Sequence, residues 1–160
     1  MGLDNIPKPY PCVAMNKAIK TTDGKIDCDK TIKAGGCDFA GMKHPVGMFG
    51  TFCWFRGKAL VRELGAIGYP DAEFLYESMS AEELARKADE LEEYLREFKK
   101  KYGEYKEAIV GAGWNGILKD NCRIEWGEHS GYDEIVDIIE KAIQWLRNLS
   151  EIGCGVEPWY

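Results

Sequence analysis

A long amphipathic pattern begins after Ser80 and limits the folds that this chain can adopt. Glu83 follows Ser80 at the spacing of a capping box, which starts a helix. Beyond it, apolar residues recur alternately four and three positions apart, and charged residues occupy the other face. The pattern predicts a helix over residues 81–102 that ends near Gly103. A single apolar stripe needs a partner surface to cover it.

A second pattern predicts a helix over residues 133–150. Its apolar positions are more numerous than one stripe requires, so this helix is expected to be the more buried of the two. Pairing the two apolar faces predicts a shared core that contains Leu91, Leu95, Ile139 and Leu146. Residues 117–126, between the helices, are predicted to form two short strands around Asp120 and Asn121.

The first 58 residues have a different composition. They hold eight Gly, four of the six Pro and four of the six Cys. The alternation of Pro7, Pro9 and Pro11 favours extended backbone. Asp23-Gly24 is a strong turn signal, which predicts a hairpin of strands over 13–20 and 25–28.

These patterns predict an α+β fold with two long antiparallel helices packed on a small β region. The 160 residues suit one domain, residues 1–160, with a loop-rich basic subregion over 1–58 and an acidic helical subregion over 59–160. Hydrophobic residues make up 45% and charged residues 30%, which is typical of a globular chain. The sequence contains no apolar run of membrane-spanning length and no visible secretory signal, so we expect a cytoplasmic protein that does not enter membranes.

Four cysteines in the loop-rich subregion are candidate zinc ligands. A segment with little apolar core gains folding energy from a metal that joins its loops. The CxxC pairs of familiar zinc sites are missing, and His44 is able to replace one thiolate. Two disulfides or four separate thiols remain open alternatives. The candidate ligands are Cys12, Cys28, Cys37 and Cys53.

The other two cysteines, Cys122 and Cys154, are expected to be small buried residues. A disulfide between them would tie the C-terminal tail to the region between the helices.

Trp54, Arg56 and Lys58 form a candidate ligand site. An aromatic face beside two cations is able to stack a base and hold a phosphate. The alternative is structural, with Trp54 in the core and both cations solvated. The sequence lacks the HExxH, Walker and GxSxG motifs and contains only two His, which disfavours a metallohydrolase.

Charge is distributed unevenly along the chain. The first 60 residues carry nine Lys and Arg against five Asp and Glu, whereas residues 61–160 carry twelve against 22, which gives the net −6. An acidic protein is a poor non-specific DNA binder, because such binding depends on neutralising phosphates. A small anionic ligand at the basic subregion remains open.

The two ends of the sequence resemble small uncharacterised proteins of phages, archaea and bacteria. The resemblance covers the opening residues 1–7 and 10–12, the segment 50–58, and the plan of the closing helix at 133–149. It implies a small accessory protein, associated with viruses, and it carries no catalytic residue over.

We therefore expect a small non-enzymatic binding or interaction protein. One alternative is a small enzyme that acts on a nucleotide or nucleic acid, with Arg56 and Lys58 on phosphate. A further alternative is an anti-defence protein that sequesters a host factor or a signal nucleotide.

Overall fold

The computed structural model shows a mixed fold of helices and short strands. The described residues are 2–36, 55–103, 117–119, 122–124 and 132–159. Within them the elements, in chain order, are β1 (Asp4–Lys8), α1 (Pro11–Ala14), α2 (Cys28–Lys33), β2 (Phe55–Arg56), α3 (Lys58–Ala66), η1 (Phe74–Tyr76), α4 (Ala81–Tyr102), β3 (Ile117–Lys119), β4 (Cys122–Ile124), α6 (Tyr132–Glu151) and β5 (Gly155–Trp159).

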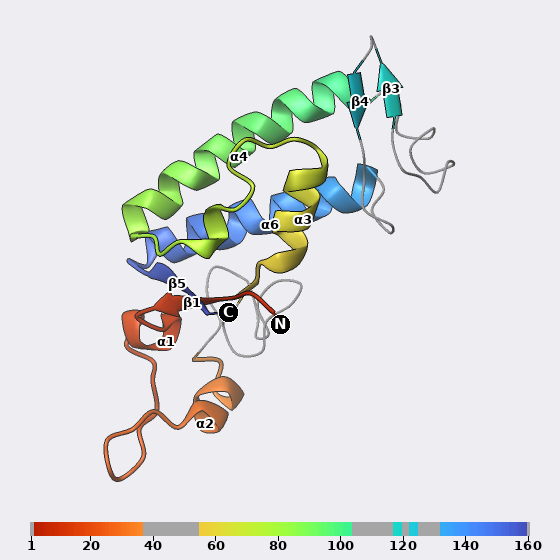
Figure 1. The fold of residues 1–160 in the computed structure, drawn as a ribbon. Helices are drawn as coiled ribbons and strands as arrows, with labels where there is room; N and C mark the ends of the chain where they lie inside the picture. The colour runs from red at the N-terminus through yellow and green to blue at the C-terminus, as the bar shows by residue number, and fades with distance from the viewer. Residues whose placement is uncertain (1, 37–54, 104–116, 120–121, 125–131, 160) are drawn as a thin grey trace.

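Two long antiparallel helices, α4 and α6, form the body of the molecule (Figure 1). The predicted capping box begins α4. The Glu83 amide donates to the Ser80 hydroxyl at 3.2 Å, and the Ser80 amide donates to the Glu83 carboxylate at 2.7 Å. The sequence-based bounds of both helices agree with the structure to within one residue. Both helix predictions are confirmed.

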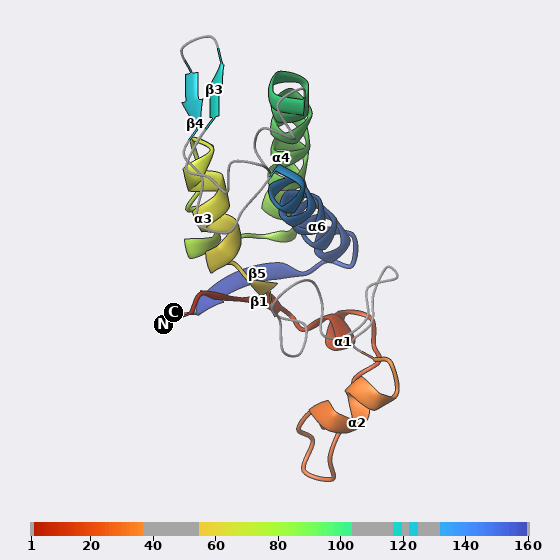
Figure 2. The same ribbon diagram turned by 90° about the vertical axis from the view of Figure 1, so that its right-hand side faces the viewer.

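The apolar faces of α4 and α6 meet as the sequence predicts. Leu91, Ile139 and Leu146 are fully buried and Leu95 is 5% exposed, and all four belong to one core cluster. The wider apolar surface of α6 has a cause that the sequence does not show: α3 also contacts α6. Figure 2 shows α3 on one side of the α4–α6 pair, and no other described helix covers the opposite side.

The N- and C-terminal strands meet in a three-stranded antiparallel sheet of order β2-β1-β5. In the β1–β5 pair, Lys8 lies opposite Gly155 and Pro7 lies opposite Val156. The amide and carbonyl of Val156 bond to Met79 on the other side of β5. Pro7 therefore stands where β1 and β5 exchange no hydrogen bond, so its missing N–H costs no bond between these strands. The extended conformation that the prolines predict is confirmed at Pro7. It is wrong at Pro11, which begins α1, because the first position of a helix needs no donor N–H.

The predicted hairpin over 13–20 and 25–28 is wrong in its strands. The turn exists, with Gly24 at a φ of +84°, but the flanking segments share only a single bridge between Lys20 and Ile26. Instead, the start of the first segment belongs to α1 and the end of the second segment belongs to α2. Pro11 occupies the first position of α1, where proline is favoured, and the Asp27 side chain accepts the Lys30 amide at the start of α2.

The strand pair predicted between the helices is present. β3 and β4 pair antiparallel, with Ile117 opposite Ile124. The predicted α+β class is confirmed, with two long antiparallel helices beside a small amount of β structure. Among the described helices, none has an apolar stretch long enough to cross a bilayer.

Candidate functional site

The structure places only part of the predicted Trp54, Arg56 and Lys58 site. Trp54 lies outside the described residues. Arg56 ends β2, where its backbone pairs with that of Asp4, and Lys58 is the exposed first residue of α3. Gly57, which has no side chain to cap the helix, stands between the two cations at the N-terminus of α3.

The four candidate zinc ligands are likewise placed only in part. Cys12 is buried in α1 and Cys28 is exposed at the start of α2, whereas Cys37 and Cys53 lie outside the described residues. Within the described residues, no three His, Cys, Asp or Glu side chains are grouped to hold a metal ion. The shared zinc site stays a prediction.

Cys154 is a buried free thiol next to β5. Burial, reinforced by the neighbouring charge of Cys12, raises the pKa of the Cys154 thiol to about 11. A thiol that stays protonated at neutral pH is a poor nucleophile. The structure confirms that Cys154 is a small buried residue. Its thiol is free, so the disulfide with Cys122 that the sequence left open is not formed.

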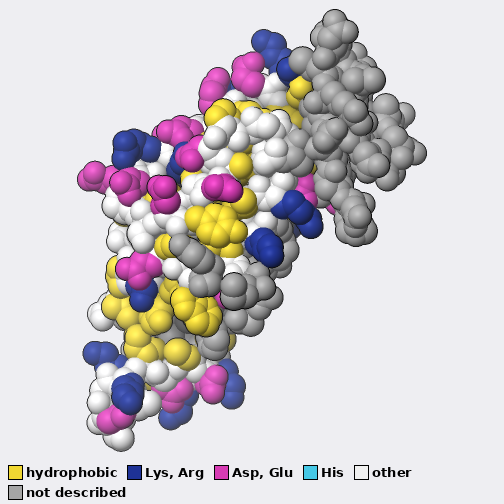
Figure 3. Space-filling view, in the orientation of Figure 1, with side chains coloured by type: hydrophobic (Ala, Val, Ile, Leu, Met, Phe, Trp, Pro, Cys, Tyr) yellow, Lys and Arg dark blue, Asp and Glu magenta, His cyan; other side chains and the backbone are white. Residues whose placement is uncertain are grey.

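The basic subregion does not present a uniformly positive surface in the part that is described. At the α2 end of the molecule, cationic and anionic side chains are interspersed (Figure 3), and in residues 15–36 all of them are Lys and Asp. Lys25 lies 4.0 Å from Asp23, and Lys30 lies 3.9 Å from Asp27. The lysine excess that the composition shows is therefore partly neutralised by neighbouring carboxylates.

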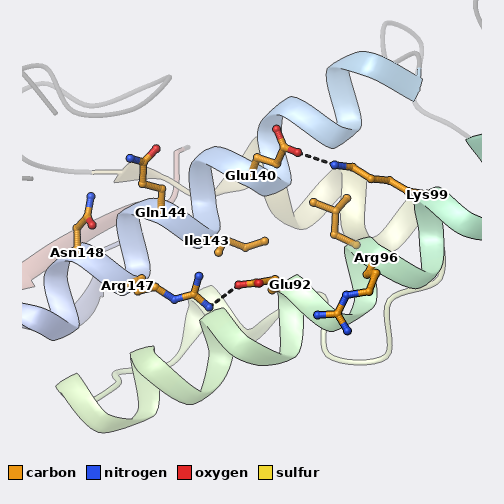
Figure 4. A pocket seen from close by; sticks show the side chains of 9 residues that line it. Glu92, Arg96, Lys99, Glu140, Ile143, Gln144, Arg147 and Asn148 are labelled. Atoms are coloured by element: carbon orange, nitrogen blue, oxygen red, sulfur yellow. Dashed lines mark hydrogen bonds and ion pairs between the residues drawn. The ribbon is translucent and has the colours of Figure 1, made fainter. Parts of the chain in front are cut away.

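A groove of about 400 Å³ runs between α4 and α6 (Figure 4). Tyr94, which faces the α3 side, donates to the Ile67 carbonyl, and the groove residues of α4 lie about half a helical turn away from it. The groove therefore lies on the face of the helix pair that α3 leaves open. Its lining residues are Glu92, Leu95, Arg96, Lys99, Glu140, Ile143, Gln144, Arg147 and Asn148.

Two ion pairs close the groove at its ends. At one end Arg147 of α6 lies 2.6 Å from Glu92 and 2.8 Å from Asp89 of α4. At the other end Lys99 of α4 donates to Glu140 of α6 at 2.7 Å. The hydrogen bond to Glu92 is the largest cause of a raised pKa at Arg147, and the hydrogen bond to Asp89 is the next largest. The Arg147 side chain therefore stays protonated.

The groove has an apolar floor between these charged ends. Leu95 and Ile143 form that floor, and both side chains are almost completely buried. Gln144 is exposed and lines the α6 wall midway along the groove. The arrangement offers a narrow apolar strip, flanked by charges of known sign and position, which suits recognition of a complementary surface.

A smaller cavity of about 210 Å³ is built around Lys87 on the other side of α4. The Lys87 side chain is only 13% exposed, and its ammonium lies 5.1 Å from the centre of the Phe74 ring. Burial alone lowers the pKa of Lys87, but hydrogen bonds to Asp71 and Glu90 outweigh it and raise the pKa overall. These contacts attach the segment before α4 to the helix, which is a structural role.

The sequence patterns did not predict the groove. The sequence does contain the charged residues that end the groove. Glu92 and Lys99 are seven residues apart on one helix, and Glu140 and Arg147 are seven residues apart on the other. That spacing puts each pair on one helix face. The sequence does not show which charges of the two helices stand opposite each other, because that depends on the register of packing.

Comparison with known proteins found no matching family model, no matching curated protein and no matching solved structure. The resemblance of the chain ends to phage, archaeal and bacterial proteins stays a prediction.

Proposed function

We propose that the protein is a non-enzymatic binding protein that receives a helical segment of a partner in the groove between α4 and α6. The observation that carries this proposal is the groove itself, with an apolar floor at Leu95 and Ile143 and an ion pair at each end. Amphipathic helices bind in grooves of this kind through an apolar stripe and flanking charges.

The electrostatics of the groove favour recognition over proton transfer. General acid–base catalysis needs a group that changes its charge near the working pH. Arg147 instead holds its charge because Glu92 and Asp89 raise its pKa. Charges that are fixed in sign and position select a partner through complementarity, which gives specificity more than raw affinity.

The proposal is tested by site-specific photo-crosslinking in the cells that produce the protein. A photoreactive phenylalanine analogue replaces Gln144 in the groove or, as a control, exposed Thr22 near α2. We expect polypeptide adducts at position 144 and few at position 22. The adducts at 144 should weaken when Lys99→Glu reverses one groove charge. Equal adducts at both positions, or none at 144, contradict the proposal.

Nucleotide binding is a second candidate function, favoured by the position of Arg56 and Lys58 on either side of the α3 N-terminus. The amides of a helix N-terminus attract anions. Replacing both cations with Glu should abolish binding of a fluorescent nucleotide while leaving the melting temperature nearly unchanged. Loss of stability without any nucleotide binding in the unmodified protein supports the structural alternative instead.

A further inference from the structure

We infer that the helical segment bound in the groove is acidic, and that its recognition depends on a carboxylate that pairs with Arg96. The inference rests on the proposed function, because it names the chemistry of the partner that the same groove receives. It is carried by the position of Arg96 among the charges that line the groove.

Arg96 differs from the other two cations of the groove. Lys99 and Arg147 are each bonded across the groove to a carboxylate of the opposite helix. In the described part of the chain, Arg96 is bonded instead to Glu93, three residues earlier on its own helix. Glu93 is not among the residues that line the groove. The charge of Arg96 is therefore balanced only from outside the groove.

The register of the helices shows what lies across the groove from Arg96. Glu92 is bonded to Arg147. Arg96 follows Glu92 by four residues, and Ile143 precedes Arg147 by four. Because the helices are antiparallel, Arg96 lies level with Ile143 and next to the level of Gln144, which are both uncharged. Figure 4 shows Arg96 on the α4 side of the groove and Gln144 on the α6 side. The middle of the groove therefore has a cation and, among its lining residues, no carboxylate.

The pair with Glu93 leaves Arg96 able to bind a second carboxylate. The Arg96 side chain is 62% exposed and that of Glu93 is 60% exposed, and such surface ion pairs contribute little to stability. A guanidinium has five N–H donors and matches the geometry of a carboxylate. A helix seated on the apolar floor would exclude water beside Arg96, which strengthens a charge-assisted hydrogen bond.

The distribution of charge along α4 favours the same sign of partner. From Arg96 to Tyr102 the helix has four cations and one carboxylate, whereas residues 81–95 have two cations and six carboxylates. A carboxylate of the partner is therefore attracted to the second half of α4 and repelled by the first half. We expect it three or four positions from the apolar residue that contacts Leu95 and Ile143, since this spacing places both on one helix face.

The test is a selection of helical peptides of about four turns, displayed on cells and sorted for binding to the folded, full-length protein. The unmodified protein should enrich peptides with Asp or Glu three or four positions from an apolar residue. Arg96→Glu should enrich Lys or Arg at that position instead, and Arg96→Gln should enrich neither charge. Arg86→Glu is the matched control, because it makes the same change at an exposed residue of α4 outside the groove, and it should select as the unmodified protein does.

Gln144 gives an independent check from the other helix. A peptide selected on the unmodified protein should bind Gln144→Lys more tightly and Gln144→Glu more weakly, since each variant adds a charge beside the level of Arg96. The same peptide should bind Arg96→Gln about tenfold more weakly, the effect of losing one hydrogen bond to a charged group. Its affinity for Arg96→Gln should also depend less on salt. Titration of a fluorescently labelled copy of the peptide measures these changes.

The outcomes separate the acidic partner from the proposed function. A carboxylate preference that reverses in Arg96→Glu and follows the charge at position 144 supports the inference. Peptides without that preference overturn it, as does a preference that Arg96→Glu leaves unchanged, or a selection that enriches no peptide. If crosslinking at position 144 still captures a polypeptide in those cases, the binding function stands and only the acidic character of the partner is excluded.

Discussion

The side-chain amide of Asn5 donates a hydrogen bond of 2.6 Å to the carbonyl of Leu75, which is 70 residues further along the chain. Both residues are buried, so this bond ties β1 to η1 inside the core. Gly57 lies against the same contact between β1 and η1, and its amide donates to the Leu3 carbonyl at 2.9 Å. A Cβ at position 57 would collide with the Asn5 side chain and lie 2.7 Å from the Leu75 side chain.

Gly57→Ala should therefore destabilise the protein by about 1–3 kcal/mol, the usual cost of overpacking. Gly65→Ala in α3 is the matched control, because a Cβ there meets no atom within 4 Å. The control should be neutral or stabilise by roughly 0.5–1 kcal/mol, since alanine is the better helix former. Urea unfolding measures both variants. Equal effects of the two substitutions would show that the contact of Gly57 with Asn5 and Leu75 is loosely packed.

The core between α4 and α6 makes a second prediction. Leu91→Ala or Ile139→Ala should lower the free energy of unfolding by about 2–5 kcal/mol, because each removes a fully buried side chain and leaves a cavity. Val136→Ala is a control on α6, where the side chain is only half-buried, and should cost less. Denaturant unfolding of the three variants tests this order. A cost at Val136 as large as at Ile139 would contradict the pairing of helix faces.

The Tyr94 hydroxyl gives a prediction in alkaline solution. Burial is the main cause that raises the pKa of Tyr94 to about 12, and the charges of Tyr102 and Tyr69 add to it. The raised folded-state pKa means that the unfolded chain ionises first, at about pH 10. The contribution of Tyr94 is therefore fully present below pH 10 and is lost as the pH rises towards 12.

Ultraviolet titration of the native protein should show this late ionisation, and Tyr94→Phe should remove it. The variant also loses the hydrogen bond from the Tyr94 hydroxyl to the Ile67 carbonyl, which costs about 0.5–1.5 kcal/mol at neutral pH. Between pH 10 and 12, stability should fall less steeply in the variant than in the unmodified protein. An unchanged late ionisation in Tyr94→Phe would assign it to another tyrosine.

The thiols should differ in reactivity. Cys28 is exposed at the start of α2, whereas Cys154 is buried and its pKa is raised to about 11. At neutral pH a thiol reagent should therefore modify Cys28 quickly and Cys154 only after unfolding. Cys28→Ser should remove one fast-reacting equivalent, and Cys154→Ser should leave the fast phase unchanged. A fast phase that is identical in both variants would show that Cys28 is protected.

The elements that depend on local chemistry could be predicted from the amino-acid sequence. The capping box at Ser80 and Glu83 and the apolar spacing after it fixed α4, since hydrogen bonds and side-chain period act within a few residues. The same reasoning placed α6 and the turn at Gly24. It failed for the strands on either side of Gly24, because Pro11 and Asp27 favour helix starts that the turn signal does not report.

Which distant segments meet depends on tertiary packing and could not be predicted from local patterns. The pairing of β1 with β5 joins residues at opposite ends of the chain, and no local pattern at Asp4 specifies Trp159 as its partner. The groove depends in the same way on the register that sets Glu92 beside Arg147 and Lys99 beside Glu140. That register follows from how the buried faces of α4 and α6 interlock, and side-chain packing is a property of both helices together.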